Sequence, residues 1–526
     1  MATGMDTDMG MKSSKLDRPC LARVPLVGIL VLVTGASTYA QEVGAGAAAK
    51  RSVAVVPRVS VTETLTNNVR LDSVGQKSEQ ITEVGPGIRV SVDGARLKTY
   101  FDYSLSKIIY AQSSSPSRTQ NALTTFGTLE AIDNWAFVDF SGSISQQAVS
   151  VFGPQSLNNT SVNANRAEVS SYRLSPYVRG ALGSWASYEA RYGRSITSSD
   201  STAGSDVTSD DANIRISGGS AFQKLGWSAD ASQQKVDYSA GRSTEGGRLS
   251  GGLTYAVTPQ LILSANAGRE SNNFTGLGKQ SYGTSGVGVN WSPSKTTKFS
   301  AMRDNRSFGS THNVRFDHRT ARTAWSFADS KGVLNTPNQT GIASLGSVYD
   351  LLFNQFASLE PDPIARAQLV NAYLQVNGIS PNAIVTSSFL TSALALQRTQ
   401  NLSFALLGIR DTITFFASRG ESSRLDSVST GLDDFNTSAL IRQRGFSVNY
   451  SHRLTPDYSL GVLASQQTTS GLISGQDTTL RSFNVNVTGK VGKKASATVG
   501  ARHVISANSA KPYTETAVTG NLNLQF

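Results

Sequence analysis

Apolar and polar side chains alternate over most of this chain, most strictly in its last segment. From Val518 to Phe526 every second residue is apolar or Gly, and polar residues stand between them: Thr519, Asn521, Asn523 and Gln525. A period of two is that of a β-strand with one apolar and one polar face. Because the chain stops on an aromatic residue, the segment is interpreted as the closing strand of an outer-membrane β-barrel. A soluble β-sandwich or solenoid is the alternative.

The same alternation recurs from Val53 onward, and it is clear in Ala95–Leu105. Leu97, Phe101 and Leu105 share one face of that segment, and charged residues share the other. An Arg or Lys that faces lipid at mid-depth costs about 2–4 kcal/mol, so these charges are expected to face a wet lumen. The same parity gives the lumen-facing candidates Arg96, Lys98, Asp102, Glu189, Arg191 and Arg215.

The connections between the alternating segments are short and long in turn. Asp93-Gly94 is a hairpin signal of the short kind, and all five Trp residues lie near short turns. The long connections are polar: Gln112–Arg118, Val149–Asn165, Ser195–Asp210, Gly420–Asp434 and Thr468–Asp477. This pattern predicts an all-β fold, a single transmembrane antiparallel β-barrel of about 22 strands (about 20–24) with short periplasmic turns and long extracellular loops. The barrel is expected to span residues 53–526.

One segment, Leu345–Ser380, breaks the alternation. Val348–Leu359 reads as a helix, and Asp362 with Pro363 can begin a second helix that ends at Gly378. By strand order this helical insert belongs to an extracellular loop, where it covers the mouth, enters the lumen or remains exposed. Its apolar stripe supplies the gate candidates Leu369, Val370, Tyr373 and Leu374.

The amino-terminal residues resemble an export signal. Four basic residues precede an apolar run, Val24–Val33, that is too short to span a bilayer. Cleavage is expected after Ala40, which makes residues 1–40 a signal peptide and residues 41–52 a periplasmic linker. A short buried helix is the alternative, and Met9 and Met11 are possible starts. No other apolar run is long enough for a membrane-spanning helix.

Composition narrows the class of protein. Only 39% of the 526 residues are apolar, which is low for a soluble chain that must fill its own cores but suits a barrel with a wet interior. The net charge of +11 is spread along the chain, without the basic and aromatic runs that indicate nucleic-acid binding. Cys20, the single Cys, lies in the predicted signal, so no disulfide, thiolate metal site or Cys nucleophile is expected in the mature chain.

The sequence gives little support for an enzyme. His312 and His318 are about 20 Å apart along a predicted strand, too far to share a metal ion. Asp210-Asp211 and Asp433-Asp434 stand in predicted loops and could bind a divalent cation, although solvated loop charges are the preferred interpretation. No Gly-x-Ser-x-Gly motif or phosphate loop is present. We therefore expect no enzyme activity, cofactor or metal, with a lipid hydrolase built inside the barrel as the alternative.

Three longer segments carry a family resemblance: Val59–Leu71 (VSVTETLTNNVRL), Ser143–Ser156 (SISQQAVSVFGPQS) and Leu359–Ser380 (LEPDPIARAQLVNAYLQVNGIS). With them the mature chain resembles the PEP-CTERM system-associated outer-membrane β-barrel family. The resemblance implies the outer membrane of a Gram-negative bacterium and proximity to exopolysaccharide synthesis and exosortase systems. It transfers no catalytic residue.

The predicted barrel, its charge pattern and the resemblance together predict the partners. These are outer-membrane lipid and lipopolysaccharide, the outer-membrane assembly machinery, and exopolysaccharide or its export proteins, with no nucleic acid. The assembly machinery would read the strand-terminal residues Leu522, Leu524 and Phe526.

Two functions remain open from the sequence. One is a passive conduit for polysaccharide or small solutes, motivated by the charged lumen-facing positions. The other is a scaffold or anchor with a closed lumen, motivated by the long loops and the helical insert.

Overall fold

The computed structural model describes residues 53–112, 114–201, 206–219, 224–334, 366–367, 370, 391, 393–426, 433–473, 475–509 and 511–526. These residues belong to one compact unit, residues 51–526. The predicted signal peptide and linker, residues 1–52, lie outside the described residues. Among the described residues, no helix is both long and apolar enough to cross a membrane.

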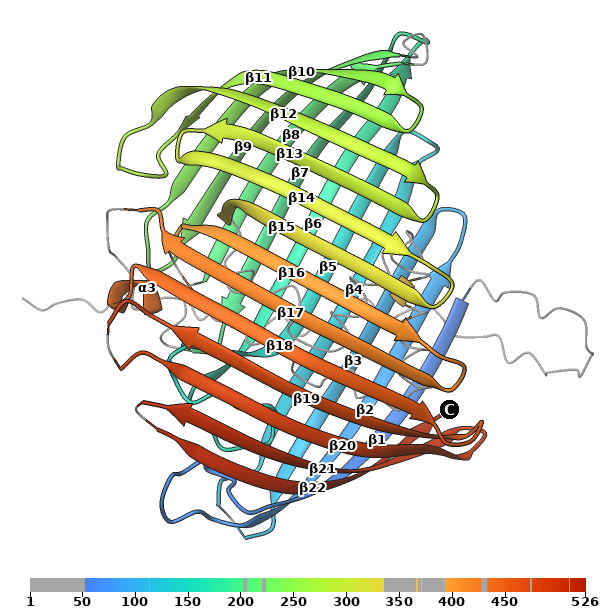
Figure 1. Ribbon diagram of the computed structural model, residues 1–526, viewed down its shortest axis with the longest axis vertical. Coiled ribbons are helices and arrows are strands. Elements are labelled where there is room, and N and C mark those ends of the chain that lie inside the picture. Colours follow the sequence, from blue (N-terminus) through green and yellow to red (C-terminus); the bar gives the residue numbers. More distant parts are fainter. Residues whose placement is uncertain are drawn as a thin grey trace, which may run out of the picture. The chain divides into compact units, whose positions relative to one another are not determined.

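The described residues of this unit form 22 strands, which are drawn in Figure 1. Their bounds are β1 Val53–Thr66, β2 Glu79–Asp93, β3 Leu97–Tyr110, β4 Arg118–Ile132, β5 Ala136–Ala148, β6 Arg166–Leu182, β7 Ala186–Ser199, β8 Val207–Gly218, β9 Leu225–Tyr238, β10 Thr244–Thr258, β11 Leu261–Asn272, β12 Gln280–Ser294, β13 Thr297–Arg306, β14 Gly309–Arg319, β15 Thr323–Leu334, β16 Ala395–Leu407, β17 Asp411–Arg424, β18 Leu440–Arg453, β19 Tyr458–Ser470, β20 Thr478–Gly492, β21 Ala495–Asn508 and β22 Tyr513–Gln525. A short helix, α3 Asp434–Thr437, precedes β18.

Pairing between the first and last strands closes the sheet into a barrel. Every strand pairs antiparallel with its sequence neighbours, and β1 also pairs with β22, where Val61 lies opposite Leu522. The backbone N–H of Phe526 donates to the carbonyl of Pro57 and extends this seam. A sheet in lipid must be closed in this way, because no water is present there to hydrogen-bond the backbone groups of an open strand edge. The predicted antiparallel barrel of about 22 strands is confirmed.

The alternation along each strand separates an outer apolar face from an inner polar face. On β22, Val518 is 49% exposed and Leu522 41%, and Phe526, which follows the strand, is 62% exposed. Glu515 and Ala517 have the opposite parity and point to the inner face, where they are only 2% and 1% exposed. The apolar residues therefore form the lipid-facing surface, as a transmembrane barrel requires. Leu522, Leu524 and Phe526 lie on this outer face, and their role in assembly stays a prediction.

Short turns occupy one rim of the barrel and the longer loops occupy most of the other. Gly94 closes the β2–β3 turn by donating from its N–H to the carbonyl of Leu97. Several strands run further than the sequence suggested: β7 continues to Ser199 and β8 begins at Val207, inside the expected loop Ser195–Asp210. A barrel strand can leave the membrane while its ladder of hydrogen bonds continues, so polar residues did not mark its end.

That extension corrects the cation site considered at Asp210-Asp211. The two residues are neighbours on β8, so their side chains point to opposite faces. Asp211 pairs with Arg173 at 2.7 Å, while Asp210 lies 3.6 Å from Arg194. The pair therefore cannot converge on one ion.

The helical insert expected over Leu345–Ser380 is not supported. Only Arg366, Ala367 and Val370 of that range are described, and these three residues are helical. Val370 is fully buried. The other gate candidates, Leu369, Tyr373 and Leu374, lie outside the described residues.

Candidate functional site at the outer mouth and inner wall

The inner wall near the short-turn rim carries charged residues joined in ion pairs. Asp102 on β3 accepts from Arg58 of β1 and from Arg89 of β2, each at 2.8 Å. The Tyr100 hydroxyl donates to the same carboxylate at 3.2 Å. The carboxylate is thus shared between two guanidinium groups and joins three neighbouring strands. The predicted lumen-facing position of Asp102 agrees with this arrangement.

A second charged group spans β5 to β7. Arg191 donates to Asp139 at 2.6 Å and to Glu189 at 3.1 Å. Its guanidinium lies over the Tyr177 ring at 3.9 Å, a cation–π geometry. Tyr177 in turn stacks on Phe137 at 5.1 Å. Arginine, carboxylate and aromatic faces therefore form one continuous surface on this part of the wall.

A polar pocket of about 450 Å³ adjoins this group and contains two of the predicted residues, Glu189 and Arg215. Arg215 is also paired with Asp230 at 2.6 Å. The pocket is lined by Asn134, Arg179, Gly180, Ser187, Tyr188, Glu189, Arg215 and Ser217. Its lining offers hydrogen-bond donors and acceptors to a polar ligand.

The other two lumen-facing candidates differ from each other. Lys98 is exposed on the face of β3 that carries Tyr100 and Asp102. Arg96 does not lie in a strand, because β3 begins at Leu97, and Arg96 belongs to the β2–β3 turn. The turn is one residue longer than the Asp93-Gly94 signal suggested, and the lumen-facing position of Arg96 stays a prediction.

The β5–β6 loop, residues 149–165, crosses the outer mouth of the barrel. It leaves β5, yet Val151 packs in a buried cluster with Ala395 of β16, Ile441 of β18 and Phe435 of α3. In a closed ring of 22 strands, β16 lies eleven strands from β5, half-way round. The loop therefore reaches inner-wall residues on the opposite side of the barrel.

Asp434 of α3 fixes the far end of this crossing. Its carboxylate accepts from the Ser150 hydroxyl at 2.6 Å and from the Val151 N–H at 2.7 Å. Burial, with a smaller contribution from the charge of Asp433, raises the pKa of Asp434 to about 6. Asp433 caps the helix by accepting from the Phe435 N–H. The pair that the sequence offered for a cation thus holds a helix and a loop together.

Further along, the loop is tied to the strands nearest β5 and to the closing strands. The Tyr513 hydroxyl of β22 donates to the carbonyl of Gln155. The Asn508 amide of β21 donates to Phe152 at 2.8 Å, and the Tyr110 hydroxyl of β3 donates to Thr160 at 2.7 Å. Backbone carbonyls of the loop are thereby satisfied by the wall, as buried polar groups require.

The loop also has internal order. The Asn158 side-chain oxygen accepts from the N–H groups of Thr160 and Ser161, an Asx-type turn. The Asn165 side chain accepts from the Ser150 N–H and donates to the Ser150 carbonyl, which closes the base of the loop. A Cβ on Gly153 would lie 2.5 Å from the Asn165 side chain, so this position requires glycine for close approach.

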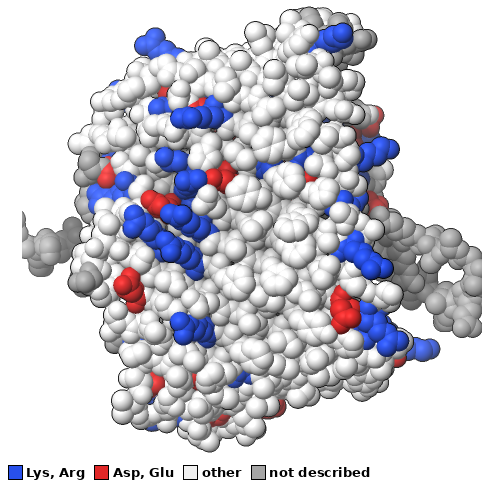
Figure 2. Space-filling view, viewed as in Figure 1, with Lys and Arg blue, Asp and Glu red and all other residues white. Residues whose placement is uncertain are grey.

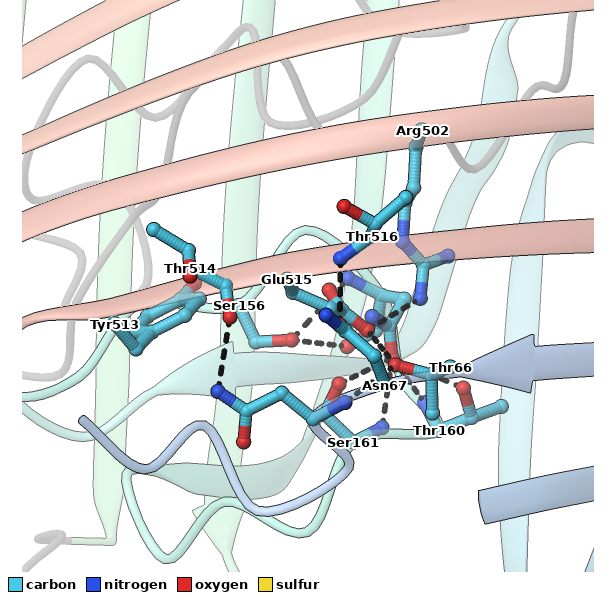
Figure 3. Close-up of polar contacts among 12 residues, drawn as sticks. Thr66, Asn67, Ser156, Thr160, Ser161, Arg502, Tyr513, Thr514, Glu515 and Thr516 are labelled. Carbon is cyan, nitrogen blue, oxygen red and sulfur yellow. Dashed lines mark hydrogen bonds and ion pairs between the residues drawn. The ribbon is translucent and has the colours of Figure 1, made fainter. Parts of the chain in front are cut away.

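The end of β1 and the start of the β1–β2 loop are tied to β21 and β22 beside the crossing loop (Figure 3). Glu515 accepts from Thr66 at 2.8 Å and from Arg502 at 2.9 Å, and the Asn67 side chain accepts from the Thr516 N–H at 2.8 Å. Leu71, in the left-handed region at φ 55°, packs in a buried cluster beneath Leu157 of the crossing loop. A left-handed leucine costs about 1–2 kcal/mol, so surrounding contacts must hold it there.

Sequence reasoning missed the mouth site, because it classed residues 149–165 as an ordinary polar loop. The available signal was the placement of Val151, Phe152 and Leu157 within that otherwise polar segment. Large apolar residues in an extracellular loop need a buried surface to pack against. Two of the segments that carried the family resemblance, Val59–Leu71 and Ser143–Ser156, contribute residues to this mouth: Leu71 packs near Leu157, and Ser150 and Val151 bind Asp434.

Within the described part of the chain, no group of three or more His, Cys, Asp or Glu side chains could hold a metal ion. His312 faces Asp329 at 3.0 Å, and His318 contacts Thr297 further along β14.

Comparisons with known proteins give a partial family match and distant structural likenesses. Residues 192–305 match the model of a protein family of unknown function, DUF481. No curated protein matches the chain. The siderophore receptor PirA from Pseudomonas aeruginosa is similar at 9% identity and TM-score 0.42, with 90% of this chain and 80% of that chain covered. The FrpB iron transporter from Neisseria meningitidis is similar at 10% identity and TM-score 0.48, with 89% and 82% covered.

Likenesses this distant say nothing of what this chain binds. The cellular location of the protein follows from the architecture of its barrel. A closed antiparallel barrel with an apolar outer face, short turns at one rim and long loops at the other is the architecture of outer-membrane proteins. The protein is an outer-membrane β-barrel of a Gram-negative envelope.

Proposed function

We propose that this protein is an outer-membrane conduit whose outer mouth is constricted by the β5–β6 loop. The observation that carries the proposal is the packing of Val151 against β16, β18 and α3 on the far side of the ring. A barrel of this strand number encloses a lumen wide enough to leak unless something narrows it. A loop that is bound to opposite sides of the barrel wall would narrow this lumen at its outer mouth.

The inner wall supports a polar cargo. The paired charges around Asp102 and Arg191 make the inner wall hydrophilic, and because they are paired they produce no large positive or negative potential. The exposed part of the aromatic surface near Tyr177 offers a flat apolar face beside hydrogen-bonding groups. Sugar rings present both kinds of surface, so the cargo we propose is polysaccharide or a small polar solute, handled without catalysis or a cofactor.

The biological setting is the finer part of the proposal. The resemblance to PEP-CTERM system-associated barrels motivates a role beside exopolysaccharide synthesis, with the glycan or its export proteins as partners. Co-purification of the protein with envelope glycan from its native membrane, compared with a strain that makes no exopolysaccharide, tests this part separately from the conduit.

The conduit is tested by replacing residues 150–164 with a short Gly-Ser turn between β5 and β6, which are adjacent strands. Single-channel conductance of the purified protein in planar bilayers should rise above that of the wild type. A correctly folded variant, shown by slower gel migration after heating, with unchanged conductance would contradict the constriction.

A scaffold with a closed lumen is the second candidate. The observation that favours it is the number of fixed contacts on the loop, from Asp434 at one end to Tyr110 at the other. In that case neither the wild type nor the loop replacement conducts, and envelope partners co-purify with the barrel in a loop-dependent way.

A further inference from the structure

The outer surface of β13–β18 carries two adjacent rows of charged and polar residues just below the long-loop rim. The first row follows the strand register, so that each residue lies directly opposite the next on the neighbouring strand: Arg303, His312, Lys331, Arg398, Glu421 and Arg442. The second row, two residues further down, runs through Asp329, Gln400, Arg419 and Arg444. We call these ten residues the outer basic patch.

The patch faces lipid rather than the lumen. Its residues have the parity of Leu402 and Phe446 on β16 and β18, which are 44% and 53% exposed. Residues of the opposite parity, Ala395 and Ile441, are buried against the crossing loop inside the mouth. Figure 2 shows Lys and Arg gathered on this face at the left of the view, over the long-loop ends of the strands.

Charge in the patch is not balanced within it. Arg303, Lys331, Arg398, Arg419, Arg442 and Arg444 are its cations, and Asp329 and Glu421 are its anions. Asp329 is close to Arg398 at 2.7 Å and His312 at 3.0 Å. Glu421 lies 3.9 Å from both Arg419 and Arg442, a long separation for an ion pair. The patch keeps a positive excess.

Like charges stand directly opposite each other in the patch. Lys331 lies across from Arg398, and Arg419 lies across from Arg444. Such pairs destabilise a sheet unless an anion bridges them. Phosphate groups are suited to this, since arginine binds them through two parallel hydrogen bonds.

The surface below the patch is apolar and aromatic. The next row contains Phe299, Phe316, Phe327, Leu402, Ala417 and Phe446. Along β17, the outward residues between Arg419 and Asp411 are all apolar: Ala417, Phe415 and Ile413. That stretch is about 27 Å along the strand and about 20 Å along the membrane normal at the usual tilt. The patch therefore lies at the headgroup edge of the outer leaflet, with an acyl-chain surface beneath it.

We propose that the outer basic patch binds a phosphorylated glycolipid of the outer leaflet, such as lipopolysaccharide. The two rows receive its phosphates, and the aromatic row below receives its acyl chains. The site is independent of the conduit, because it lies on the other face of the same strands.

The test uses full-length protein in detergent and purified bisphosphorylated lipid A as the probe. The double variant Arg419→Gln/Arg444→Gln should bind about tenfold more weakly than the wild type, which is ~1.4 kcal/mol. A charge-matched control, Arg410→Gln/Arg453→Gln, removes two cations near the short-turn rim and should bind like the wild type. Circular dichroism and heat-dependent gel migration check that both variants fold.

Dephosphorylated lipid A and phosphatidylglycerol complete the design on the wild type, where folding is not in question. The wild type should bind dephosphorylated lipid A more weakly than the phosphorylated form. Equal binding of the two forms, or equal binding by the wild type and the patch variant, overturns the site. Phosphatidylglycerol binding as tight as that of lipid A, and equally dependent on Arg419 and Arg444, overturns the assignment to a glycolipid.

Discussion

The Ser150 hydroxyl donates a 2.6 Å hydrogen bond to the carboxylate of Asp434, a residue 284 positions later in the chain. Ser150 follows β5, and Asp434 begins the helix before β18 on the far side of the ring. Because Asp434 is only 8% exposed, its charge is held where water cannot stabilise it. This contact makes the crossing of the mouth sensitive to pH.

The first prediction concerns that pH dependence. The pKa of Asp434 is about 6 in the folded protein, above its ordinary value of 3.8. A raised pKa means that the contribution to stability is fully present below about pH 4 and is lost as the pH rises through about 6. The loss is on the order of 2–3 kcal/mol, felt locally at the loop. Residues 150–164 should exchange backbone hydrogens more readily at pH 7.5 than at pH 5 after correction for intrinsic rates.

Asp434→Asn is the control for this prediction. An asparagine can accept from the Val151 N–H and donate to the Ser150 hydroxyl, so it mimics the protonated acid. Loop protection in this variant should not change between pH 5 and pH 7.5. Asp434→Ala leaves the Val151 N–H without its partner, which costs about 1–3 kcal/mol, and should loosen the loop at both values. A pH response that persists in Asp434→Asn would contradict the assignment.

The second prediction concerns the apolar anchor of the loop. Val151→Asp places a second carboxylate beside Asp434 and within the cluster of Phe435 and Ile441. An unpaired buried charge is strongly unfavourable, so the loop should detach and become open to added protease. The matched control is Val74→Asp, since Val74 lies in the β1–β2 loop and is 86% exposed. Equal cleavage of both variants and the wild type would show that Val151 does not anchor the loop.

The third prediction concerns the inner wall and rests on the conduit. Asp102→Asn leaves Arg58 and Arg89 without their shared carboxylate. Reversal potentials in a salt gradient should shift toward anion preference. The two guanidinium groups lose their shared acceptor and repel each other, so the temperature at which the barrel unfolds should also fall.

Asp230→Asn is the comparison for the inner wall. It unpairs Arg215, whose side chain is 62% exposed, and so should change stability much less. If Asp102→Asn lowers the unfolding temperature without altering ion preference, Asp102 has a structural role and its charge does not affect the ions that pass through the lumen.

The sequence by itself determined the barrel and the side of the wall on which its residues lie. A side-chain period of two is set by the backbone, so Leu522, Asp102 and Glu189 could be assigned to their faces without a structure. Strand ends were less predictable, because β7 and β8 continue beyond the membrane into polar sequence. Arg96, expected within a strand, lies in the β2–β3 turn because that hairpin is one residue longer than its sequence signal suggested.

Only the tertiary structure decided what lies at the mouth and what gathers on the outer surface. Ser150 and Asp434 meet because ring closure puts β5 opposite β16–β18, and no local pattern encodes that distance. The same holds for Arg419 and Arg444, which are adjacent only through the register of β17 with β18. Alternation fixes the face of a residue, whereas its neighbours depend on register and on the number of strands in the ring.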